Sequence, residues 1–334
     1  MKFDAFVLTG ARTLEMREIE AVPGREEILV RVAAALTCGT DTKMYLRGHA
    51  KFTFPSLFGH ELSGVIAEAG EAVKGFAPGD EVMVPVSAPC GVCGYCRRGL
   101  ECQCETLFDG KVWGAFARYC LIPARVAARN VFPKPKLLPF SEAALLDPLA
   151  SVLHAYEHCP SVPGAALLVL GGGPMGFLHA VAGQKRGLAV TVADIRKDRL
   201  DLFESAGFAV VLVEEGWEQS RLGRFDLVME CSGAVQAFAS GMRVLAPGGT
   251  LCVFAGLPEG QELTFDGAAL HYRQQKIVGS FHYGRRAVAE AYALLCSREL
   301  PLAPIFSSTY PLEGLPEVME KVLRGEGMKY IIEP

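Results

Sequence analysis

The sequence predicts an α/β protein in which a doubly wound parallel sheet follows a β-rich domain. Two patterns support this prediction. The first 150 residues carry short alternating or β-branched runs interrupted by Gly and Pro, which is typical of irregular β structure. From about Gly164, short apolar runs alternate with longer helical stretches, which is typical of βαβ units and a parallel sheet. At 334 residues, the chain is long enough for two domains of about 150 residues each.

Six strands are expected in the second part, each a short apolar run. Helical stretches between them, such as 197–206 and 234–245, supply the crossovers. The tail then reads as two helices, RRAVAEAYALLCSREL and LEGLPEVMEKVLRG, which we expect to pack back on the first domain. The strands are expected at 165–170, 189–193, 209–213, 225–230, 250–255 and 277–281.

Charge and composition argue against several kinds of partner. A net charge of -4 gives no long-range field that would gather nucleic acid or an anionic membrane. The stretch between Glu157 and Lys185 has no charged residue, but prolines and glycines break it into pieces too short to span a membrane. The start, MKFDAFVLTG, shows no export signal, so we expect a cytoplasmic protein.

A glycine-rich turn marks a dinucleotide site. Gly171, Gly173 and Gly176 follow the order G-x-G-x-x-G after an apolar strand and at the start of a helix, which suits a pyrophosphate at the helix N-terminus. Asp194 ends the next strand, where a carboxylate binds the adenosine ribose hydroxyls and repels a 2′-phosphate, so NAD is favoured over NADP. Arg196 and Lys197 argue mildly for the phosphate. The expected cofactor residues are Gly171, Gly173, Pro174, Met175, Gly176, Asp194 and Arg199.

The segment APCGVCGYCRRGLECQCE, residues 88–105, gathers five of the eleven cysteines. In a reducing compartment such a cluster is more often a metal site than a set of disulfides. Thiolates spaced C-x-x-C-x-x-C, with a fourth eight positions on, can close around a structural zinc. An iron–sulfur cluster and a redox pair are the alternatives, and Cys102 could replace Cys104. The expected zinc ligands are Cys90, Cys93, Cys96 and Cys104.

A second metal set lies in glycine-flanked loops of the β-rich domain. Cys38 occurs in LTCGTDTKMY, and His60 and Glu61 occur in LFGHELSG. A mixed Cys and His set with an open position describes a catalytic zinc rather than a structural one. Taken singly, each residue is as readily explained as core or as a hydrogen-bonded polar group.

These motifs together resemble the zinc-dependent medium-chain alcohol and polyol dehydrogenases. CGTD, GHE, the cysteine segment, a DP dipeptide and the glycine turn occur in the order found in that family. The resemblance implies a GroES-like catalytic domain over 1–148, a Rossmann NAD-binding domain over 149–281, and a return to the catalytic domain over 282–334.

The resemblance also implies roles for individual residues. Cys38 and His60 are expected to bind the catalytic zinc, with Asp147 as third ligand directly or through water, and Glu61 beside the metal as an exchangeable ligand. Asp41 is expected to orient the ligand histidine, although a helix cap before Thr42 explains it equally well. Thr40 is expected to relay the released proton.

The expected reaction moves a hydride between a secondary alcohol and NAD, since zinc makes an alcohol proton acidic near neutral pH. We expect a small-molecule polyol, sugar or cyclitol substrate and a homo-oligomer, either dimer or tetramer. The alternatives are an L-threonine 3-dehydrogenase-like enzyme, an NADPH-dependent carbonyl reductase and a non-enzymatic dinucleotide-binding regulator. Departures from the family occur at Lys43, where a relay histidine is common, and at His282, where sorbitol-type relatives have arginine. Arg285 and Arg286 could meet an anionic substrate group, or simply start an exposed helix.

Overall fold

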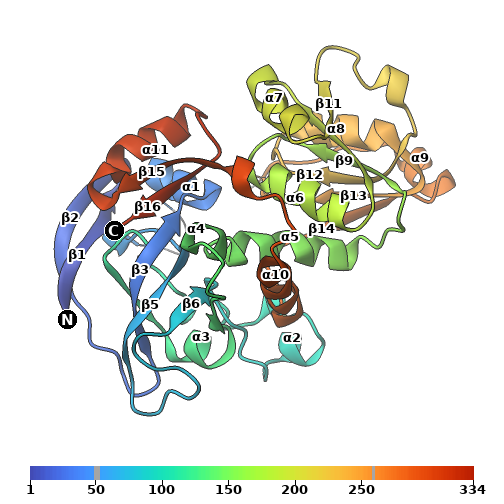
Figure 1. The fold of residues 1–334 in the computed structure, drawn as a ribbon. Coiled ribbons are helices and arrows are strands. Elements are labelled where there is room, and N and C mark those ends of the chain that lie inside the picture. Colours follow the sequence, from blue (N-terminus) through green and yellow to red (C-terminus); the bar gives the residue numbers. More distant parts are fainter. Residues whose placement is uncertain (49–52, 258–259) are drawn as a thin grey trace. The chain divides into compact units, whose positions relative to one another are not determined.

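The chain forms two compact units (Figure 1). The computed structural model describes residues 1–48, 53–257 and 260–334. The first unit comprises Met1–Ala150, Tyr283–Glu299 and Ile305–Pro334, and the second comprises Ser151–His282 and Leu300–Pro304.

The first unit is built on two β-sheets. A seven-stranded sheet has the order β15-β16-β3-β5-β6-β8, with β7 also paired to β3, and a smaller sheet has the order β2-β1-β4. Strand β3 lies at the centre and pairs with β16, β5 and β7, which explains why its sequence ILVRVAAAL is apolar at almost every position. The strands are β1 (Lys2–Gly10), β2 (Thr13–Glu20), β3 (Ile28–Leu36), β4 (Ser56–Leu57), β5 (Glu61–Ala69), β6 (Glu81–Val84), β7 (Tyr119–Ile122), β8 (Phe132–Pro133), β15 (Phe306–Pro311) and β16 (Lys329–Glu333).

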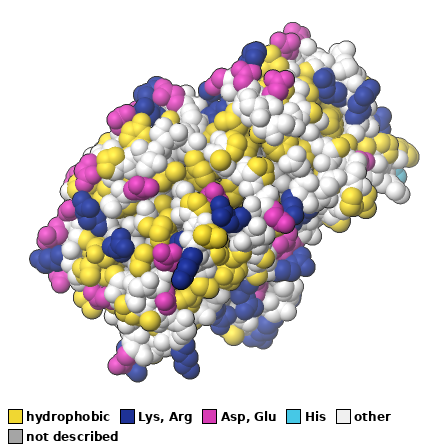
Figure 2. Space-filling view, viewed as in Figure 1, with side chains coloured by type: hydrophobic (Ala, Val, Ile, Leu, Met, Phe, Trp, Pro, Cys, Tyr) yellow, Lys and Arg dark blue, Asp and Glu magenta, His cyan; other side chains and the backbone are white. Residues whose placement is uncertain are grey.

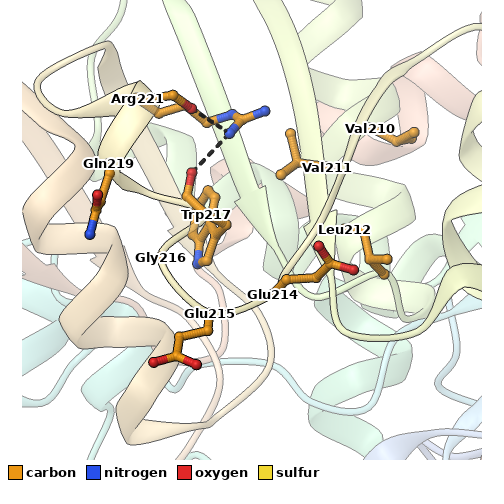
Figure 3. Close-up of a pocket in the computed structure, with 10 residues that line it drawn as sticks. Val210, Val211, Leu212, Glu214, Glu215, Gly216, Trp217, Gln219 and Arg221 are labelled. Atoms are coloured by element: carbon orange, nitrogen blue, oxygen red, sulfur yellow. Dashed lines mark hydrogen bonds between the residues drawn. The ribbon is translucent and has the colours of Figure 1, made fainter.

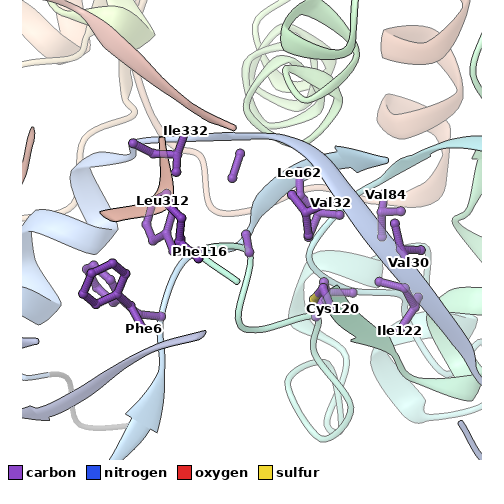
Figure 4. Packing of buried hydrophobic residues seen from close by; sticks show 14 of the residues in the cluster. Phe6, Val30, Val32, Leu62, Val84, Phe116, Cys120, Ile122, Leu312 and Ile332 are labelled. Carbon is purple, nitrogen blue, oxygen red and sulfur yellow. The ribbon is translucent and has the colours of Figure 1, made fainter. Parts of the chain in front are cut away.

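The core of this unit joins the sheet to the chain's tail. Val30, Val32 and Leu62 from the central strands share one buried cluster with Leu312 and Ile332 from the last thirty residues (Figure 4). This shared core is the physical reason why the tail returns to the first unit. The helices of this unit are α1 (Gly39–Arg47), α2 (Gly94–Arg97), α3 (Ala124–Arg129), α4 (Phe140–Ala143), α10 (Arg285–Ser297) and α11 (Leu315–Leu323), with 3₁₀ turns η1 (Glu101–Gln103) and η4 (Leu312–Gly314). The 3₁₀ turn η3 (Ala303–Ile305) begins in the second unit and ends in the first.

The second unit is a six-stranded parallel sheet in the order β11-β10-β9-β12-β13-β14. The order reverses between β9 and β12, and ligands of doubly wound sheets bind at the carboxyl ends of strands at such a reversal. The strands are β9 (Ala166–Leu170), β10 (Ala189–Asp194), β11 (Ala209–Leu212), β12 (Phe225–Glu230), β13 (Leu245–Val253) and β14 (Lys276–Gly279).

Helices cover the strands of the second unit. In helix α6 (Pro174–Lys185) each position from Gly176 to Gly183 is buried, which explains why this stretch carries no charged side chain. Among the described residues, we find no helix with the length and apolarity needed to cross a bilayer. The helices are α6 (Pro174–Lys185), α7 (Lys197–Ser205), α8 (Val235–Val244) and α9 (Gly267–Tyr272), with η2 (Gln219–Arg221), while α5 (Leu146–His158) runs from the first unit into the second.

The structure differs from the expected elements in three places. Strand β13 begins at Leu245 rather than Thr250, because its pairing with β12 continues to Phe225 through an irregularity in register. The tail is not only helical, since β15 and β16 join the central sheet. Helix α1 begins at Gly39, so Asp41 lies inside it rather than before it.

Figure 2 shows the charged side chains on one face of the molecule. On the face shown in Figure 2, basic and acidic side chains are intermingled over much of the surface. This mixture accords with the small net charge of -4.

Candidate active site

The loop after β3 places a thiol at the start of a helix. Cys38 is the N-cap residue of α1 and is partly buried. Asp41, at the third position of the helix, accepts a hydrogen bond from the Cys38 backbone N–H to Oδ2 at 3.0 Å, which forms a capping box. This capping interaction between neighbouring residues holds Cys38 at the start of α1.

Strand pairing brings His60 and Glu61 beside this thiol. Glu61, the first residue of β5, pairs with Leu36, two residues before Cys38. One ligand atom from each of Cys38, His60 and Glu61 lies within 4.8 Å of the other two. Gly59 makes the turn possible because its φ is +86° and a Cβ there would lie 2.6 Å from the Phe116 ring.

Asp41 also orients the imidazole. Its Oδ1 lies 3.1 Å from His60 Nδ1, so Nδ1 carries the proton and Nε2 is the acceptor atom of the neutral ring. Trp113 stacks on the same ring, with centroids 5.1 Å apart and planes 2° from parallel. One carboxylate therefore positions both the thiol loop and the imidazole, so the capping and the orienting interpretations of Asp41 both describe the structure.

The electrostatics of this group favour a cation. Burial alone lowers the pKa of His60, but the neighbouring charges of Asp41 and Cys38 outweigh it and raise that pKa well above its usual value. A surrounding that stabilises a proton on the imidazole also stabilises a metal ion in the proton's place. Thiolate, imidazole and carboxylate are the ligands that zinc takes in proteins, and a set of three protein ligands is typical of catalytic zinc.

A buried lysine completes the group. Lys329 of β16 donates from Nζ to Glu61 Oε2 at 2.5 Å and to the Thr37 carbonyl at 3.0 Å. Both charged side chains are 1% exposed. Burial raises the pKa of Glu61, and the ammonium of Lys329 opposes that rise. The ammonium of Lys329 therefore compensates the charge of the Glu61 carboxylate, which is buried beside Cys38 and His60.

Asp147 lies in the first turn of α5 and is not one of the three clustered residues. Its Oδ1 accepts from the Val86 backbone N–H at 2.7 Å and from the hydroxyl of Tyr283, and its side chain is buried. Its charge contributes to the raised pKa of Glu61, so it lies within electrostatic range of the group. Thr40, in the first turn of α1, is exposed.

The cysteine segment forms a second, separate cluster in the first unit. One sulfur from each of Cys90, Cys93, Cys96 and Cys104 lies within 4.8 Å of the other three, whereas Cys102 is buried outside this group. The sulfurs of Cys90 and Cys96 are 3.9 Å apart. Two thiolates on one tetrahedral zinc are about 3.8 Å apart, given Zn–S bonds of about 2.3 Å, so the four residues fit such an ion.

Backbone N–H groups favour the thiolate form of Cys90, whereas burial raises the pKa of Cys96 to about 12. Cys90 Sγ accepts from the N–H groups of Val92 at 3.4 Å and Cys93 at 3.3 Å, and these bonds lower its pKa to about 6. The segment is anchored to α10, because Glu101 Oε2 accepts from the Arg285 N–H and Oε1 accepts from its guanidinium, both at 2.8 Å. Arg285 therefore links the start of α10 to the cysteine segment.

The second unit carries the glycine turn at the reversal of strand order. Gly171 has a φ of +110° and a Cβ there would lie 3.0 Å from the Ser232 N atom, on the loop after β12. Gly176 admits no side chain, since a Cβ would lie 1.9 Å from the Gly171 oxygen. At Gly173, the N-cap of α6, a Cβ would meet no heavy atom within 4 Å. The helix start is therefore open on the side where a phosphate would approach.

Asp194 closes the other side of this turn. It accepts from the Gly172 N–H at 2.6 Å and from the Arg196 N–H at 2.8 Å. The nearby cations are engaged elsewhere: Arg196 Nε donates to Asp198 at 3.0 Å, and Lys197 donates to Asp201 at 2.7 Å. Arg199 Cβ would lie 3.2 Å from a Cβ on Gly172, so its side chain begins beside the turn. Pro174 and Met175 form the first turn of α6.

A hollow of about 450 Å³ lies elsewhere in the second unit, along β11 and the loop after it (Figure 3). Its lining includes Glu214, Trp217 and Arg221, and Arg221 donates to the Trp217 carbonyl at 2.8 Å. None of the residues expected at the active site lines it.

Comparison with known proteins decides the family. Residues 24–136 match the model of the alcohol dehydrogenase GroES-like domain, and residues 174–297 match that of the zinc-binding dehydrogenases. L-threonine 3-dehydrogenase of Deinococcus deserti is 32% identical, over 93% of this chain and 92% of its own. The chain belongs to the zinc-dependent medium-chain alcohol and polyol dehydrogenases. As a member of that family it is an oxidoreductase.

Other relatives agree with this assignment. D-xylulose reductase A of Aspergillus oryzae is 29% identical to this dehydrogenase, over 98% of this chain and 96% of its own. A Sinorhizobium meliloti structure described as a zinc-binding dehydrogenase bound to NADP superposes with a TM-score of 0.91, at 26% identity and full coverage of both chains. The expected fold class, a GroES-like domain with a Rossmann parallel sheet, is confirmed.

Three residues of the dehydrogenase site were not singled out from the sequence for the contacts they make. Lys329 lies in MKYIIEP. A lysine within an apolar strand is unusual, and this was the only feature of the sequence that could have pointed to it. No feature of the sequence around Trp113 indicates that its ring stacks on His60. Tyr283 follows His282 in the sequence, but its bond to Asp147 spans 136 positions and no sequence pattern indicates it.

Proposed function

We propose that this dehydrogenase moves a hydride between a secondary alcohol and NAD, with a catalytic zinc held by Cys38, His60 and Glu61. The observation that carries the proposal is the convergence of one thiol, one imidazole and one carboxylate to within 4.8 Å in a chain that also carries the glycine turn. When bound, zinc would polarise the alcohol oxygen and lower the pKa of its proton, and NAD would accept the hydride.

The chain's own residues have separate tasks in this proposal. Asp41 holds the His60 proton on Nδ1, which leaves Nε2 as the nitrogen that would bind the ion. Lys329 balances the charge of Glu61. If the Glu61 carboxylate left the zinc, a water or substrate oxygen could take its place on the ion. Thr40, exposed two residues after Cys38, is the hydroxyl that we assign to proton transfer toward solvent.

Asp147 takes a supporting position in this proposal. Its Oδ1 accepts from Val86 and Tyr283, which holds the side chain in place, and Asp147 is not among the three residues whose ligand atoms converge. We therefore assign it a place beside Glu61, where it can bind the ion through water. The four sulfurs of Cys90, Cys93, Cys96 and Cys104 hold a structural zinc, because a closed S₄ set leaves no position for substrate.

Cofactor preference follows from the end of β10. Asp194 places a carboxylate at the turn, and the nearby Arg196 and Lys197 are paired with acidic neighbours, so the site favours a ribose hydroxyl over a 2′-phosphate. NADP is the alternative, favoured by the Sinorhizobium meliloti neighbour that binds it. The ratio of kcat/KM for the two cofactors separates the alternatives.

The substrate class is a small secondary alcohol or its ketone. The named substrates of two relatives, L-threonine and D-xylulose, share a hydroxyl or carbonyl at a secondary carbon. Polyols, sugars and cyclitols present this group in their chains or rings, and L-threonine is the amino-acid alternative. We place the enzyme in the cytoplasm, because a clustered set of cysteines in a reducing compartment is more often a metal site than a set of disulfides.

The test is NADH formation with a panel of polyols, sugar alcohols and L-threonine, combined with two variants. We expect His60→Ala to abolish turnover, because it removes a ligand of the open site, and to affect melting less than Cys93→Ala does. We expect Cys93→Ala to lower the melting temperature, because it leaves three thiolates at the closed site. Equal behaviour of the two variants would contradict the assignment of one catalytic and one structural zinc.

A further inference from the structure

A third group of metal-type ligands lies at the end of α5, in the second unit. His154, Glu157 and His158 are spaced His-x-x-Glu-His, and one ligand atom of each lies within 4.8 Å of the other two. His154 is buried, Glu157 is partly buried and His158 is exposed. Residues four apart on a helix share one face, so the two imidazoles meet above a single turn.

Glu157 determines which nitrogen of His154 can bind a cation. Its Oε2 lies 2.9 Å from His154 Nδ1, and a carboxylate can only accept, so Nδ1 carries the proton. The acceptor atom of the neutral ring is then Nε2. That atom faces His158, whose Nε2 lies 3.3 Å away.

The separation of these two nitrogens matches a shared metal ion. Two imidazole nitrogens on one tetrahedral ion, each at about 2.0–2.1 Å, are about 3.3–3.4 Å apart. The carboxylate behind His154 repeats the arrangement in which a ligand histidine donates its other N–H to an acidic residue. Imidazole ligands suit Zn²⁺, Ni²⁺ and Cu²⁺ rather than Mg²⁺ or Ca²⁺.

We propose that His154 and His158 form a surface site for a divalent transition metal, in which Glu157 is a positioning residue. With two protein ligands and one exposed imidazole, the remaining positions of the ion would be filled by water. The site is additional to the catalytic and structural zinc and does not depend on the proposed function.

The test uses the zinc-loaded enzyme and Ni²⁺ alone as the probe, measured by equilibrium dialysis with elemental analysis. We expect the wild-type chain to take up one more nickel than His158→Gln. The exposed His271 lies outside the cluster on α9, so His271→Gln should keep that nickel and serves as the matched control. Glu157→Gln should weaken nickel binding about 10- to 100-fold without changing turnover or melting.

A second measurement needs no variant. Nickel should slow the modification of His158 by diethyl pyrocarbonate, followed by mass spectrometry, and should leave His271 unprotected. Equal nickel uptake by wild type and His158→Gln, or equal labelling of His158 with and without nickel, would overturn the proposal. The two imidazoles would then be joined by a hydrogen bond only.

Discussion

The substitution Asp41→Asn tests how the metal-ligating group is held. Asp41 accepts two hydrogen bonds with two oxygens, from the Cys38 N–H at 3.0 Å and from His60 Nδ1 at 3.1 Å. Asparagine has one acceptor oxygen and one NH₂ donor, so it cannot accept both bonds. Either one of the two bonds is lost, or the NH₂ donates to His60 Nδ1 and the ring proton moves to Nε2, the nitrogen that would bind the metal. The change is nearly isosteric, so it removes a charge and disturbs the orientation of His60 without opening a cavity.

The expected effect can be worked from these contacts. A hydrogen bond to a charged group contributes about 1.5–3 kcal/mol, and loss of the carboxylate behind a ligand histidine weakens metal binding about 10- to 100-fold. We expect zinc affinity at the Cys38 and His60 site to fall by that factor, with turnover lost at limiting zinc and partly restored by excess zinc.

The assay is competition between the protein and a zinc chelator of known affinity, read out by a zinc-dependent dye. The four-cysteine site is the internal control, because Asp41 does not contact it and its zinc should be retained as in wild type. Unchanged affinity at the first site, or equal loss from both sites, would refute this reasoning.

Three further predictions address charge at buried positions and at the cofactor. Asp194→Asn should lower the ratio of kcat/KM for NAD to that for NADP by about tenfold or more, because it removes the charge that repels a 2′-phosphate; an unchanged ratio would place cofactor selection elsewhere. Lys329→Met should destabilise the metal-free protein by roughly 3–5 kcal/mol in denaturant, because Glu61 stays buried without its cation, and less when zinc is bound; an equal loss in both states would argue against zinc beside Glu61. His179 is fully buried, neither ring nitrogen has a hydrogen-bond partner among the described residues, and burial lowers its pKa to about 3. Because the unfolded chain binds that proton below about pH 6.5 and the folded chain does not, stability falls as the pH falls through this range, by about 2 kcal/mol at pH 5. His179→Leu should therefore gain about that much relative to wild type between pH 8 and pH 5, measured as the difference in unfolding free energy, and a pH-independent difference would count against this origin.

The sequence was most informative where chemistry depends on short spacing. The cysteine segment and the glycine turn each lie within about twenty residues, and backbone geometry within a loop or a strand–turn–helix unit brings their members together without long-range contacts. The parallel sheet was predictable for a similar reason, since each βαβ unit repeats a local pattern. The strands themselves were expected to within a few residues, apart from the early start of β13.

Contacts between segments that are far apart in the sequence could not be predicted from local sequence patterns. Lys329 reaches Glu61 across 268 positions, because β16 adds to the sheet beside β3, and no periodicity in the tail indicates that pairing. The same limit applies to Asp147, whose hydrogen bonds come from Val86 and Tyr283. The order of the motifs could suggest that Asp147 belongs to the site. Its hydrogen-bond partners could not be predicted, because they lie 61 and 136 positions away and meet it only in the folded chain.

The central claim is that a zinc ion lies between Cys38, His60 and Glu61. The most direct measurement is anomalous diffraction from crystals of the zinc-loaded enzyme, with data above and below the zinc absorption edge. We predict two strong peaks in the first unit, one among the four sulfurs of the cysteine segment and one bonded to Cys38 Sγ and His60 Nε2. A fully occupied cysteine site with no zinc at Cys38 and His60 would contradict the account.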